Sequence, residues 1–363
     1  MNLEQPDLLL SVAQLQRAEG HTTWQSPSNI AVIKYWGKHG VQLPRNPSVS
    51  FTLRDAVTTT QLGFAPRQSA QTEPISLQFS FEGQPNEAFR AKQVKFLASL
   101  LPIFPFLKQL DLTISSRNSF PHSAGIASSA SSMSALAMCL CDLESMLFGH
   151  DFDEKMLQKA SFLARLGSGS ACRSLYPTMA IWGETPSVKK SSDLYAVEFE
   201  PHPIFKNYHD AILIAGKGEK SVSSRMGHGL MDGNAYAPAR YAQANQRMET
   251  VLNAFRTGDV ETFGQILEDE AMTLHALMMT SSPSFTLLRP NTLAMIEKLR
   301  QFRAETKTPV YFTLDAGPNP HVMYPDSVAT VVKNFIESEL VPLCENGFWI
   351  ADKVGNGAAK ISL

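Results

Sequence analysis

The sequence predicts a globular protein of mixed structure, either α/β or α+β, and two kinds of pattern support this class. Stretches that alternate polar and apolar residues, such as SVSFTL (48–53) and ISLQFSFEG (75–83), are typical of strands. From Met133 onward the apolar residues instead recur every three or four positions, which predicts an amphipathic helix. The leucines that show this period are Leu136, Leu140, Leu143 and Leu147. The sequence contains no internal repeat.

The remaining elements follow in order along the chain. In the first half, strands are expected at 28–37 (SNIAVIKYWG), 48–53, 56–64 and 75–83, the last closed by a Glu-Gly turn. The pattern breaks between 205 and 210, and DAILIAGKGEK (210–220) begins a new strand, which indicates a domain boundary there. In the second half, strands are expected at 312–314 and 321–324, and a second amphipathic helix over 328–340.

Composition and charge exclude several classes of protein. With 363 residues, the chain is long enough for two domains or one large one. Its net charge of −2 argues against a general binder of nucleic acid or anionic membranes, because both need a basic excess. No stretch reaches the roughly 18 apolar residues of a membrane span, and the start of the chain does not resemble a signal peptide. The four cysteines form no CxxC pair, which predicts reduced thiols in the cytoplasm.

A run of small residues before the first predicted helix suits phosphate binding. The segment SFPHSAGIASSASSMSAL begins at Ser119 and passes through Gly125 into the helix. Small residues leave the amides of the first helical turn accessible, and the helix dipole favours an anion there. The hydroxyls of Ser128 and Ser129 can add donors or a magnesium ligand. We interpret the segment as a phosphate cradle that is neither a Walker loop nor a GxGxxG motif, and a Ser/Ala-rich helix start is the alternative.

Two further segments place polar groups where they suit phosphate oxygens. Lys34 and Lys38 flank Tyr35 at the expected end of a strand, although solvated lysines are the commoner reading of such a pair. In KGEKSVSSRMG, Ser224 and Arg225 follow a turn, and the alternative is an ordinary loop. Neither segment indicates a phosphate site by itself, and each supports one only together with the other segments.

Asp315 and Arg173 are the remaining candidates for chemistry. The strand FTL delivers Asp315 to a Gly-Pro-Asn turn, where an aspartate either bonds backbone amides or acts as a general base. In SGSACRSLY (168–176), Arg173 stands among residues too small to shield it, which predicts a socket for an acidic small molecule. A solvated arginine in an exposed loop is the alternative.

These segments resemble one family closely. PHSAGIASSAS resembles the ATP loop of the superfamily of galactokinase, homoserine kinase, mevalonate kinase and phosphomevalonate kinase. NIAVIKYWGK, GSGSACRSLY, VSSR and DAGPN narrow the resemblance to the mevalonate diphosphate decarboxylases, and they stand in that family's order. The resemblance extends from about Asn29 to the carboxyl end and includes Leu274-His275-Ala276.

The resemblance implies a two-lobed α+β fold of the GHMP-kinase type, with mixed or antiparallel sheets, packed helices and an active site in the cleft between the lobes. The expected domains are 1–207, which binds ATP and includes an extension at 1–23, and 208–363. The implied reaction is the ATP-dependent decarboxylation of (R)-5-diphosphomevalonate to isopentenyl diphosphate, with release of ADP, phosphate and CO₂, in isoprenoid biosynthesis. ATP is the implied co-substrate and Mg²⁺ the implied cofactor. A cytoplasmic homodimer is expected, with no nucleic-acid or membrane partner.

The resemblance also implies roles for individual residues. The expected catalytic residues are Asp315, as the base beside the 3-hydroxyl, Arg173, as the holder of the substrate carboxylate, and Lys34, which neutralises charge. The expected substrate-binding residues are Tyr35, Lys38, Ser168, Ser170, Arg173, Ser224 and Arg225. The expected ATP-binding residues are Ser123, Gly125, Ile126, Ala127, Ser128 and Ser129, and Ser128 is also the expected metal ligand.

Two departures from the family pattern leave the substrate open at this stage. Pro47 and Pro177 stand where other residues are commoner in the family, and both can reshape the pocket wall. Two activities of the same fold therefore remain as alternatives, a mevalonate-type 3-kinase and a decarboxylase that prefers 5-phosphomevalonate. A third alternative, a sensor that binds nucleotide or metabolite without catalysis, is disfavoured by the intact Asp315, the lysines and the phosphate loop.

Overall fold

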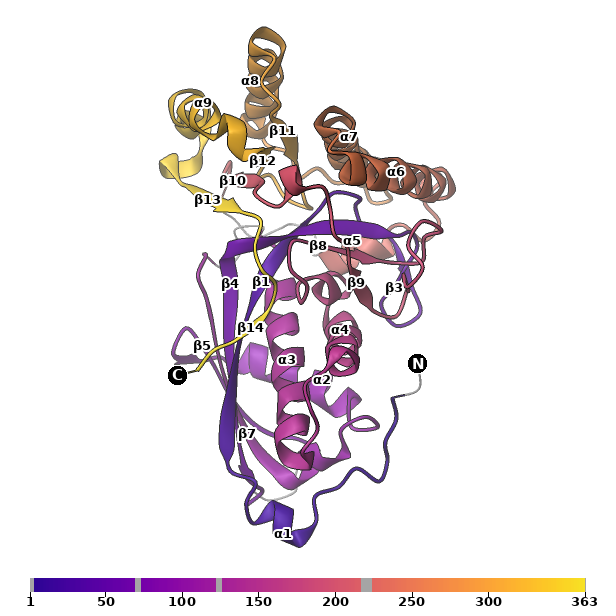
Figure 1. Ribbon diagram of the computed structural model, residues 1–363, viewed down its shortest axis with the longest axis vertical. Helices are drawn as coiled ribbons and strands as arrows, with labels where there is room; N and C mark the ends of the chain where they lie inside the picture. Colours follow the sequence, from indigo (N-terminus) through magenta and orange to yellow (C-terminus); the bar gives the residue numbers. More distant parts are fainter. Residues whose placement is uncertain (1–2, 69–72, 122–125, 217–223, 363) are drawn as a thin grey trace.

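Two β-sheets, each packed with its own helices, form two lobes that lie one above the other in Figure 1. The computed structural model describes residues 3–68, 73–121, 126–216 and 224–362. Within these residues, one sheet has eight strands, the second has four, and a two-stranded hairpin stands apart. The structure confirms the predicted α+β class, because most strand pairs are antiparallel and helices pack against both sheets.

The N-terminal lobe has its long strands on one side and its helices on the other (Figure 1). Its sheet has the order β14-β1-β4-β7-β5-β6, with β8 paired to β4 and β9 paired to β8. The strands are β1 (Gly20–Ala31), β4 (Ser48–Pro66), β5 (Ser76–Phe81), β6 (Gln84–Pro85), β7 (Leu110–Asn118), β8 (Met179–Trp182), β9 (Ala196–Glu198) and β14 (Ala359–Lys360). The helices are α1 (Val12–Leu15), α2 (Glu87–Ser99), α3 (Ser128–Phe148) and α4 (Glu154–Gly167), and the hairpin is β2 (Lys38–His39) with β3 (Leu43–Pro44).

The two longest strands differ from the sequence prediction. The strands expected at 48–53 and 56–64 are one continuous strand, β4. At their junction, the amides of Arg54, Asp55 and Ala56 donate to the carboxylate of Asp352, which replaces the missing strand neighbour. The strand expected at 28–37 ends at Ala31, so the lysine-containing segment beyond it is a loop.

Helix α3 is the central helix of the N-terminal lobe. It begins at Ser128, directly after the small-residue run, which confirms the predicted helix. Most of its apolar residues are buried against β1, β4 and α4. By length and composition α3 could cross a membrane, but 72% of its apolar window is buried inside the protein, as in a core helix.

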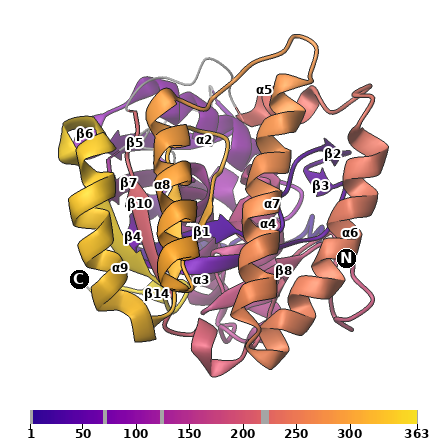
Figure 2. The same ribbon diagram turned by 90° about the horizontal axis from the view of Figure 1, so that it is seen from above.

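The C-terminal lobe places four long helical segments over a small antiparallel sheet. The sheet has the order β11-β12-β10-β13, and Figure 2 shows α6, α7, α8 and α9 side by side above it. The strands are β10 (His209–Leu213), β11 (Tyr311–Thr313), β12 (His321–Tyr324) and β13 (Trp349–Lys353). The helices are α5 (Ser224–Gly229), α6 (Ala237–Thr257), α7 (Val260–Met279), α8 (Pro290–Thr306) and α9 (Ala329–Phe335). The helix expected over 328–340 is α9 followed by a π-helical turn, Ile336–Leu340.

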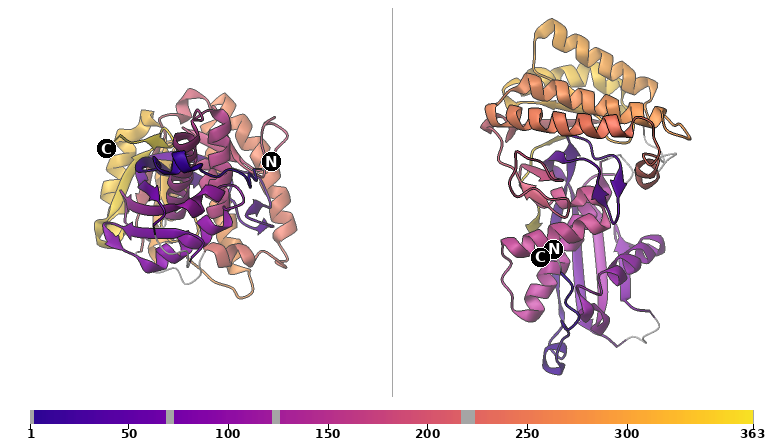
Figure 3. Two further views of the ribbon diagram at one scale, coloured as in Figure 1. Left: turned by 90° about the horizontal axis from the view of Figure 1, so that it is seen from below. Right: turned by 90° about the vertical axis from the view of Figure 1, so that its right-hand side faces the viewer.

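An aromatic cluster joins the two lobes. Phe51 of β4 contacts Tyr208 at 6.0 Å and Phe255 of α6 at 5.8 Å between ring centroids. Phe205 and Phe263 complete the cluster, and all five rings are fully buried. The end of the chain also returns to the N-terminal lobe, where Lys360 of β14 pairs with Trp24 of β1. The right-hand view of Figure 3 shows this close stacking of the helical layer on the lower lobe. The lobes therefore meet through a packed core rather than a linker.

Residues 3–20 pack onto the N-terminal lobe. Leu10 and Ala18 are buried in its hydrophobic core, and the amide of Leu10 donates to Gln109. The segment expected as an extension thus covers one end of this lobe, and β1 begins within it at Gly20.

Candidate active site

A cavity of about 470 Å³ lies where loops of both lobes meet. The three residues predicted to be catalytic, Lys34, Arg173 and Asp315, all line it. So do half of the other predicted residues, namely Tyr35, Lys38, Ser168, Ser170, Ala127 and Ser129. The fold thus gathers segments that lie up to 281 residues apart in the chain.

Lys34 and Asp315 form an ion pair across the lobe junction. Lys34 follows β1 in the N-terminal lobe and Asp315 follows β11 in the C-terminal lobe, and 3.0 Å separates Nζ from Oδ1. The Lys34 side chain is only 2% exposed, whereas that of Asp315 is 29% exposed and faces the cavity. A buried ammonium needs such a partner, so each residue fixes the position of the other.

His275 holds the backbone at Asp315. Its Nε2 lies 3.1 Å from the carbonyl oxygen of Asp315. Burial lowers the pKa of His275 to about 4, so the imidazole is neutral at physiological pH. Because a carbonyl only accepts, the neutral ring carries its proton on Nε2 and donates it.

Arg173 is a buried guanidinium held by neutral oxygen atoms. Its Nε donates to Ser50 at 2.8 Å, and its two terminal nitrogens donate to Ser48 and to Asn29 Oδ1 at 3.2 Å. The residue is 1% exposed, which excludes the solvated arginine considered as an alternative. Across the described part of the chain, no carboxylate lies within ion-pair distance of it, although it lines the cavity. Burial lowers the pKa of Arg173, which expresses the cost of a desolvated charge without a carboxylate.

The cavity carries an excess of positive charge. Among its described lining residues are four basic side chains, Lys34, Lys38, Lys92 and Arg173, against one carboxylate, that of Asp315. Lys38 stands in the hairpin β2–β3, and its Nζ donates to Gln42 at 2.9 Å. Such a balance favours a polyanionic ligand.

Tyr35 and His228 form an aromatic wall of the cavity. Their ring centroids are 4.3 Å apart, and the buried hydroxyl of Tyr35 has no hydrogen-bond partner among the described residues. Burial raises the pKa of Tyr35, so this hydroxyl is a neutral donor. His228 Nδ1 accepts the amide of Gly37 at 3.0 Å, where φ is +98° and a Cβ atom would collide with Tyr241. Burial, and then the charge of Lys38, lower the pKa of His228 to about 3.

The start of α3 also lines the cavity. Its N-cap residue, Ala127, provides no side-chain cap. Because the amide of Ala130 donates to the Ala127 carbonyl, the amides of Ser128 and Ser129 are the candidates in the first turn for binding a ligand. Ser129 lines the cavity, and its hydroxyl lies 3.3 Å from that of Ser168. Ser128 begins the helix without being among the lining residues described. Ile126 is buried and its carbonyl accepts from Ser28.

Four predicted residues cannot be placed in this way. Ser123 and Gly125 lie outside the described residues. Ser224 and Arg225 begin α5, close in the chain to His228, but their side chains lie outside the description as well.

Sequence reasoning missed the residues that support Arg173. Ser48 and Ser50 alternate along β4 and therefore face the same side of the sheet, which is a signal that the sequence does contain. Asn29 supports the same site twice, because its Nδ2 donates to the Ser170 carbonyl and to the Ser174 hydroxyl. His228 carries no sequence signal of its own.

Two family models match almost the whole chain. Residues 26–194 match the diphosphomevalonate decarboxylase-like N-terminal domain, and residues 211–350 match the mevalonate 5-diphosphate decarboxylase C-terminal domain. The diphosphomevalonate decarboxylase mvd1 of Aspergillus fumigatus is 30% identical over 92% of this chain and 84% of its own length.

Solved structures of the same kind superimpose on the fold. The mevalonate diphosphate decarboxylase of Staphylococcus aureus matches with a TM-score of 0.83 and 25% identity, over 96% of this chain and 100% of that one. A structure of MDDEF in complex with MVAPP, AMPPCP and magnesium matches with a TM-score of 0.81 and 28% identity, over 95% and 100% of the two chains.

The neutral, buried state of His228 predicts a pH-dependent stability. In the unfolded chain its imidazole takes up a proton near pH 6.5, whereas in the folded chain it does so only near pH 3. The unfolded state therefore binds more protons between these values, and the free energy of unfolding falls as the pH falls. From pH 6.5 to pH 5 this group should contribute a loss of about 2 kcal/mol.

The measurement compares urea unfolding of the wild type and of His228→Gln at several pH values. We expect the variant to lose less stability on acidification, by about 2 kcal/mol at pH 5. His21→Gln is the control, because His21 is exposed and its replacement should leave the slope unchanged. Equal slopes for the wild type and His228→Gln would show that His228 is protonated in the folded protein.

Proposed function

Because the chain belongs to the diphosphomevalonate decarboxylase family, we propose roles in that reaction for the residues that line the cavity. The activity is the ATP-dependent decarboxylation of (R)-5-diphosphomevalonate to isopentenyl diphosphate, with release of ADP, phosphate and CO₂. ATP is the co-substrate and Mg²⁺ is the metal ion. One observation carries the assignment of roles: a buried Arg173, which has no carboxylate partner among the described residues, shares one cavity with the Lys34–Asp315 pair.

Asp315 is the proposed base for the first chemical step. Its carboxylate faces the cavity and would accept the proton of the tertiary 3-hydroxyl while the γ-phosphoryl group of ATP is transferred to that oxygen. Lys34 keeps the carboxylate oriented and ionised, and its ammonium offsets the negative charge that gathers around the transferred group.

Arg173 is the proposed partner of the substrate carboxylate. A planar guanidinium binds a carboxylate through two parallel hydrogen bonds, and the small neighbours Ser168 and Ser170 leave room for it. A carboxylate that leaves as CO₂ loses its negative charge, so strong attraction by Arg173 alone would favour the ground state. Arg173 therefore acts by orientation, because it aligns the breaking carbon–carbon bond with the departing phosphate.

The diphosphate end of the substrate is proposed to bind beside Tyr35 and Lys38. Both residues line the cavity, and Tyr35 offers a hydroxyl that has no partner among the described residues, while Lys38 offers its ammonium. Ser224 and Arg225 are assigned to the same group by their place in the family motif.

The start of α3 is the proposed site for the phosphates of ATP. The described residues that contribute are Ile126, Ala127, Ser128 and Ser129, and Ser123 and Gly125 join them by motif. Among the described residues there is no cluster of three His, Cys, Asp or Glu side chains, which fits an ion held mainly by phosphates and water. Ser128, with its neighbours, would supply protein oxygen to Mg²⁺, which neutralises charge on the phosphates when it is bound.

The organisation of the whole chain is also part of the proposal. We propose residues 1–207 as the ATP-binding domain and 208–363 as the second domain. The two separate sheets support this division, except that β14 near the end of the chain joins the first sheet. We propose a homodimer on the family resemblance alone, and light scattering of the purified protein tests it. A cytoplasmic location is supported by four buried, unpaired cysteines.

Asp315→Asn tests the base. The amide keeps the shape but cannot take the proton, so kcat should fall about 10²-fold or more while substrate and ATP affinities change little. The measurement is steady-state turnover together with binding titrations. Near-normal turnover of a folded variant would make Asp315 a structural residue.

Arg173→Lys tests the carboxylate partner. Lysine keeps the charge but loses the two-pronged geometry, so turnover should slow through misalignment more than nucleotide affinity falls. The measurement is CO₂ release at saturating ATP, beside a titration of ATP binding. A variant that is weakened only in ATP binding would place Arg173 in the nucleotide site instead.

The length of the phosphate tail tests the substrate. A monophosphate reaches only part of the group formed by Tyr35, Lys38, Ser224 and Arg225, and each charge-assisted hydrogen bond contributes roughly 1.5–3 kcal/mol. We expect kcat/KM for 5-diphosphomevalonate to exceed that for 5-phosphomevalonate by about 10²-fold or more, with mevalonate lower still. Equal or better activity on the monophosphate would contradict the assignment, and phosphorylation without CO₂ release would indicate the 3-kinase.

A further inference from the structure

Helix α7 contacts both members of the Lys34–Asp315 pair through their backbones. The Glu270 carboxylate accepts the backbone amide of Lys34 at 2.9 Å, and His275 Nε2 donates to the carbonyl of Asp315 at 3.1 Å. Glu270 and His275 stand only five residues apart on one helix, and both are at most 1% exposed. The two residues that they hold come from different lobes.

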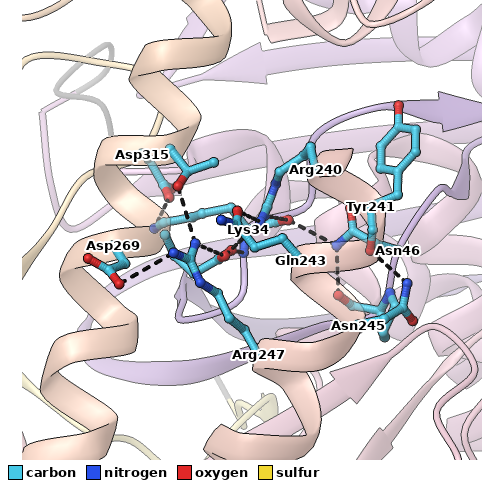
Figure 4. A network of polar contacts seen from close by, with 12 residues as sticks. Lys34, Asn46, Arg240, Tyr241, Gln243, Asn245, Arg247, Asp269 and Asp315 are labelled. Atoms are coloured by element: carbon cyan, nitrogen blue, oxygen red, sulfur yellow. Dashed lines mark hydrogen bonds and ion pairs between the residues drawn. The ribbon is translucent and has the colours of Figure 1, made fainter. Parts of the chain in front are cut away.

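Two arginines, Arg240 and Arg247, hold Glu270 in turn, and Figure 4 shows both of them close to Lys34. Arg240 of α6 binds both carboxylate oxygens, at 2.6 and 2.5 Å, and Arg247 adds a bond at 2.9 Å. Arg240 also donates to the carbonyl of Lys34 at 3.2 Å, and Asn46 donates to the same carbonyl at 3.1 Å. The backbone of Lys34 is thus held on both sides. Glu270 binds its amide nitrogen, and Arg240 and Asn46 bind its carbonyl oxygen.

This arrangement is more than stability requires. Burying an ion pair carries a desolvation cost that apolar side chains of similar volume avoid, so α6 and α7 could pack at least as well without one. Two further hydrogen bonds of these ions reach the backbone of Lys34: Glu270 accepts from its amide and Arg240 donates to its carbonyl. A lysine has four rotatable methylene groups, and its ammonium points reproducibly only if the start of that chain is fixed. Leu274, between Glu270 and His275, lines the cavity itself.

We propose that α7 sets the geometry of the Lys34–Asp315 pair, with Glu270 as the positioning residue for Lys34 and His275 as the positioning residue for Asp315. This inference rests on the proposed function, because the pair matters only if it performs the phosphoryl-transfer step. We place Glu270 in contact with neither substrate nor ATP, so it acts only through Lys34.

The test is a double-mutant cycle on the full-length enzyme. Glu270→Gln loosens the Lys34 backbone, so kcat should fall by roughly 10–100-fold, the cost of a small misplacement of a catalytic group. The KM values for ATP and 5-diphosphomevalonate should change by no more than about threefold. When Lys34→Met is also present, Glu270→Gln should cause no further loss of kcat, because there is no ammonium left to position. Losses that multiply in the double variant would overturn the proposal.

A matched control separates positioning from stability. Glu144 and Lys159 form an equally buried pair between α3 and α4, with Nζ–O distances of 2.8 and 2.7 Å, and they contact no lining residue of the cavity by these bonds. Glu144→Gln should lower the melting temperature as Glu270→Gln does, yet leave kcat within about twofold of the wild type. An equal loss of kcat in both variants would show a general effect of destabilisation and would overturn the proposal.

Conservative variants keep the test decisive if Glu270→Gln does not fold. Arg240→Lys keeps the charge beside Glu270 but loses the hydrogen bond from the guanidinium to the Lys34 carbonyl, and its loss of kcat should likewise vanish when Lys34→Met is present. For Asp315, His275→Gln can still donate from an amide nitrogen and should retain kcat, whereas His275→Leu should lose it. Equal kcat values for these two His275 variants would overturn the role of His275. If Asp315→Asn abolishes turnover while Glu270→Gln and Arg240→Lys leave it intact, this inference fails and the proposed function stands.

Discussion

The ion pair between Lys34 and Asp315 is the constraint on which the rest of the site depends, because its two members belong to different lobes. An ammonium that is 2% exposed cannot exchange its partner for water, so the 3.0 Å distance persists only if the lobes keep their relative position. The aromatic cluster around Phe51 and the return of β14 to the first sheet provide that rigidity. The hydrophobic core therefore fixes the distance between the loops that carry Lys34 and Asp315, and the proposed chemistry depends on that distance.

The charge balance of the cavity explains why Arg173 lacks a carboxylate partner within the described structure. A protein carboxylate beside it would remove the desolvation cost of the guanidinium, but it would also occupy the place of the substrate. Serine and asparagine oxygens hold the group in position and leave its charge uncompensated. The cost is offset when an anionic ligand binds, so part of the stability of the empty protein is given up for affinity. Stabilising replacements at Arg173 would be expected to abolish binding.

Much of this site could be predicted from the sequence, because turn and helix-start chemistry is local. The placement of Asp315 after a strand, and the start of α3 at Ser128, follow from patterns a few residues long. The supports of the site follow from no such pattern. Glu270 binds a backbone amide 236 residues away, and Arg173 depends on serines more than 120 residues earlier in the chain. The continuity of β4 was missed for the same reason, since the carboxylate that bridges its junction comes from Asp352, near the end of the chain.

The two successive steps of the proposed reaction also require that the Lys34–Asp315 pair be rigid. During phosphoryl transfer, Asp315 takes a proton and Lys34 offsets negative charge. Asp315 must then pass this proton to water through its exposed face, which restores the carboxylate. When the new phosphate departs, positive charge develops at carbon 3, and the restored carboxylate stabilises this charge, whereas the ammonium of Lys34 would oppose it. The same two groups are therefore close to negative charge in the first step and to positive charge at carbon 3 in the second. This requires that the carboxylate stay nearer the carbon than the ammonium does. Asp315 is partly exposed to the cavity whereas Lys34 is buried, so the carboxylate is the nearer of the two to the substrate. Holding both backbones from one helix preserves the order through both steps, because neither side chain can approach the substrate at the expense of the other.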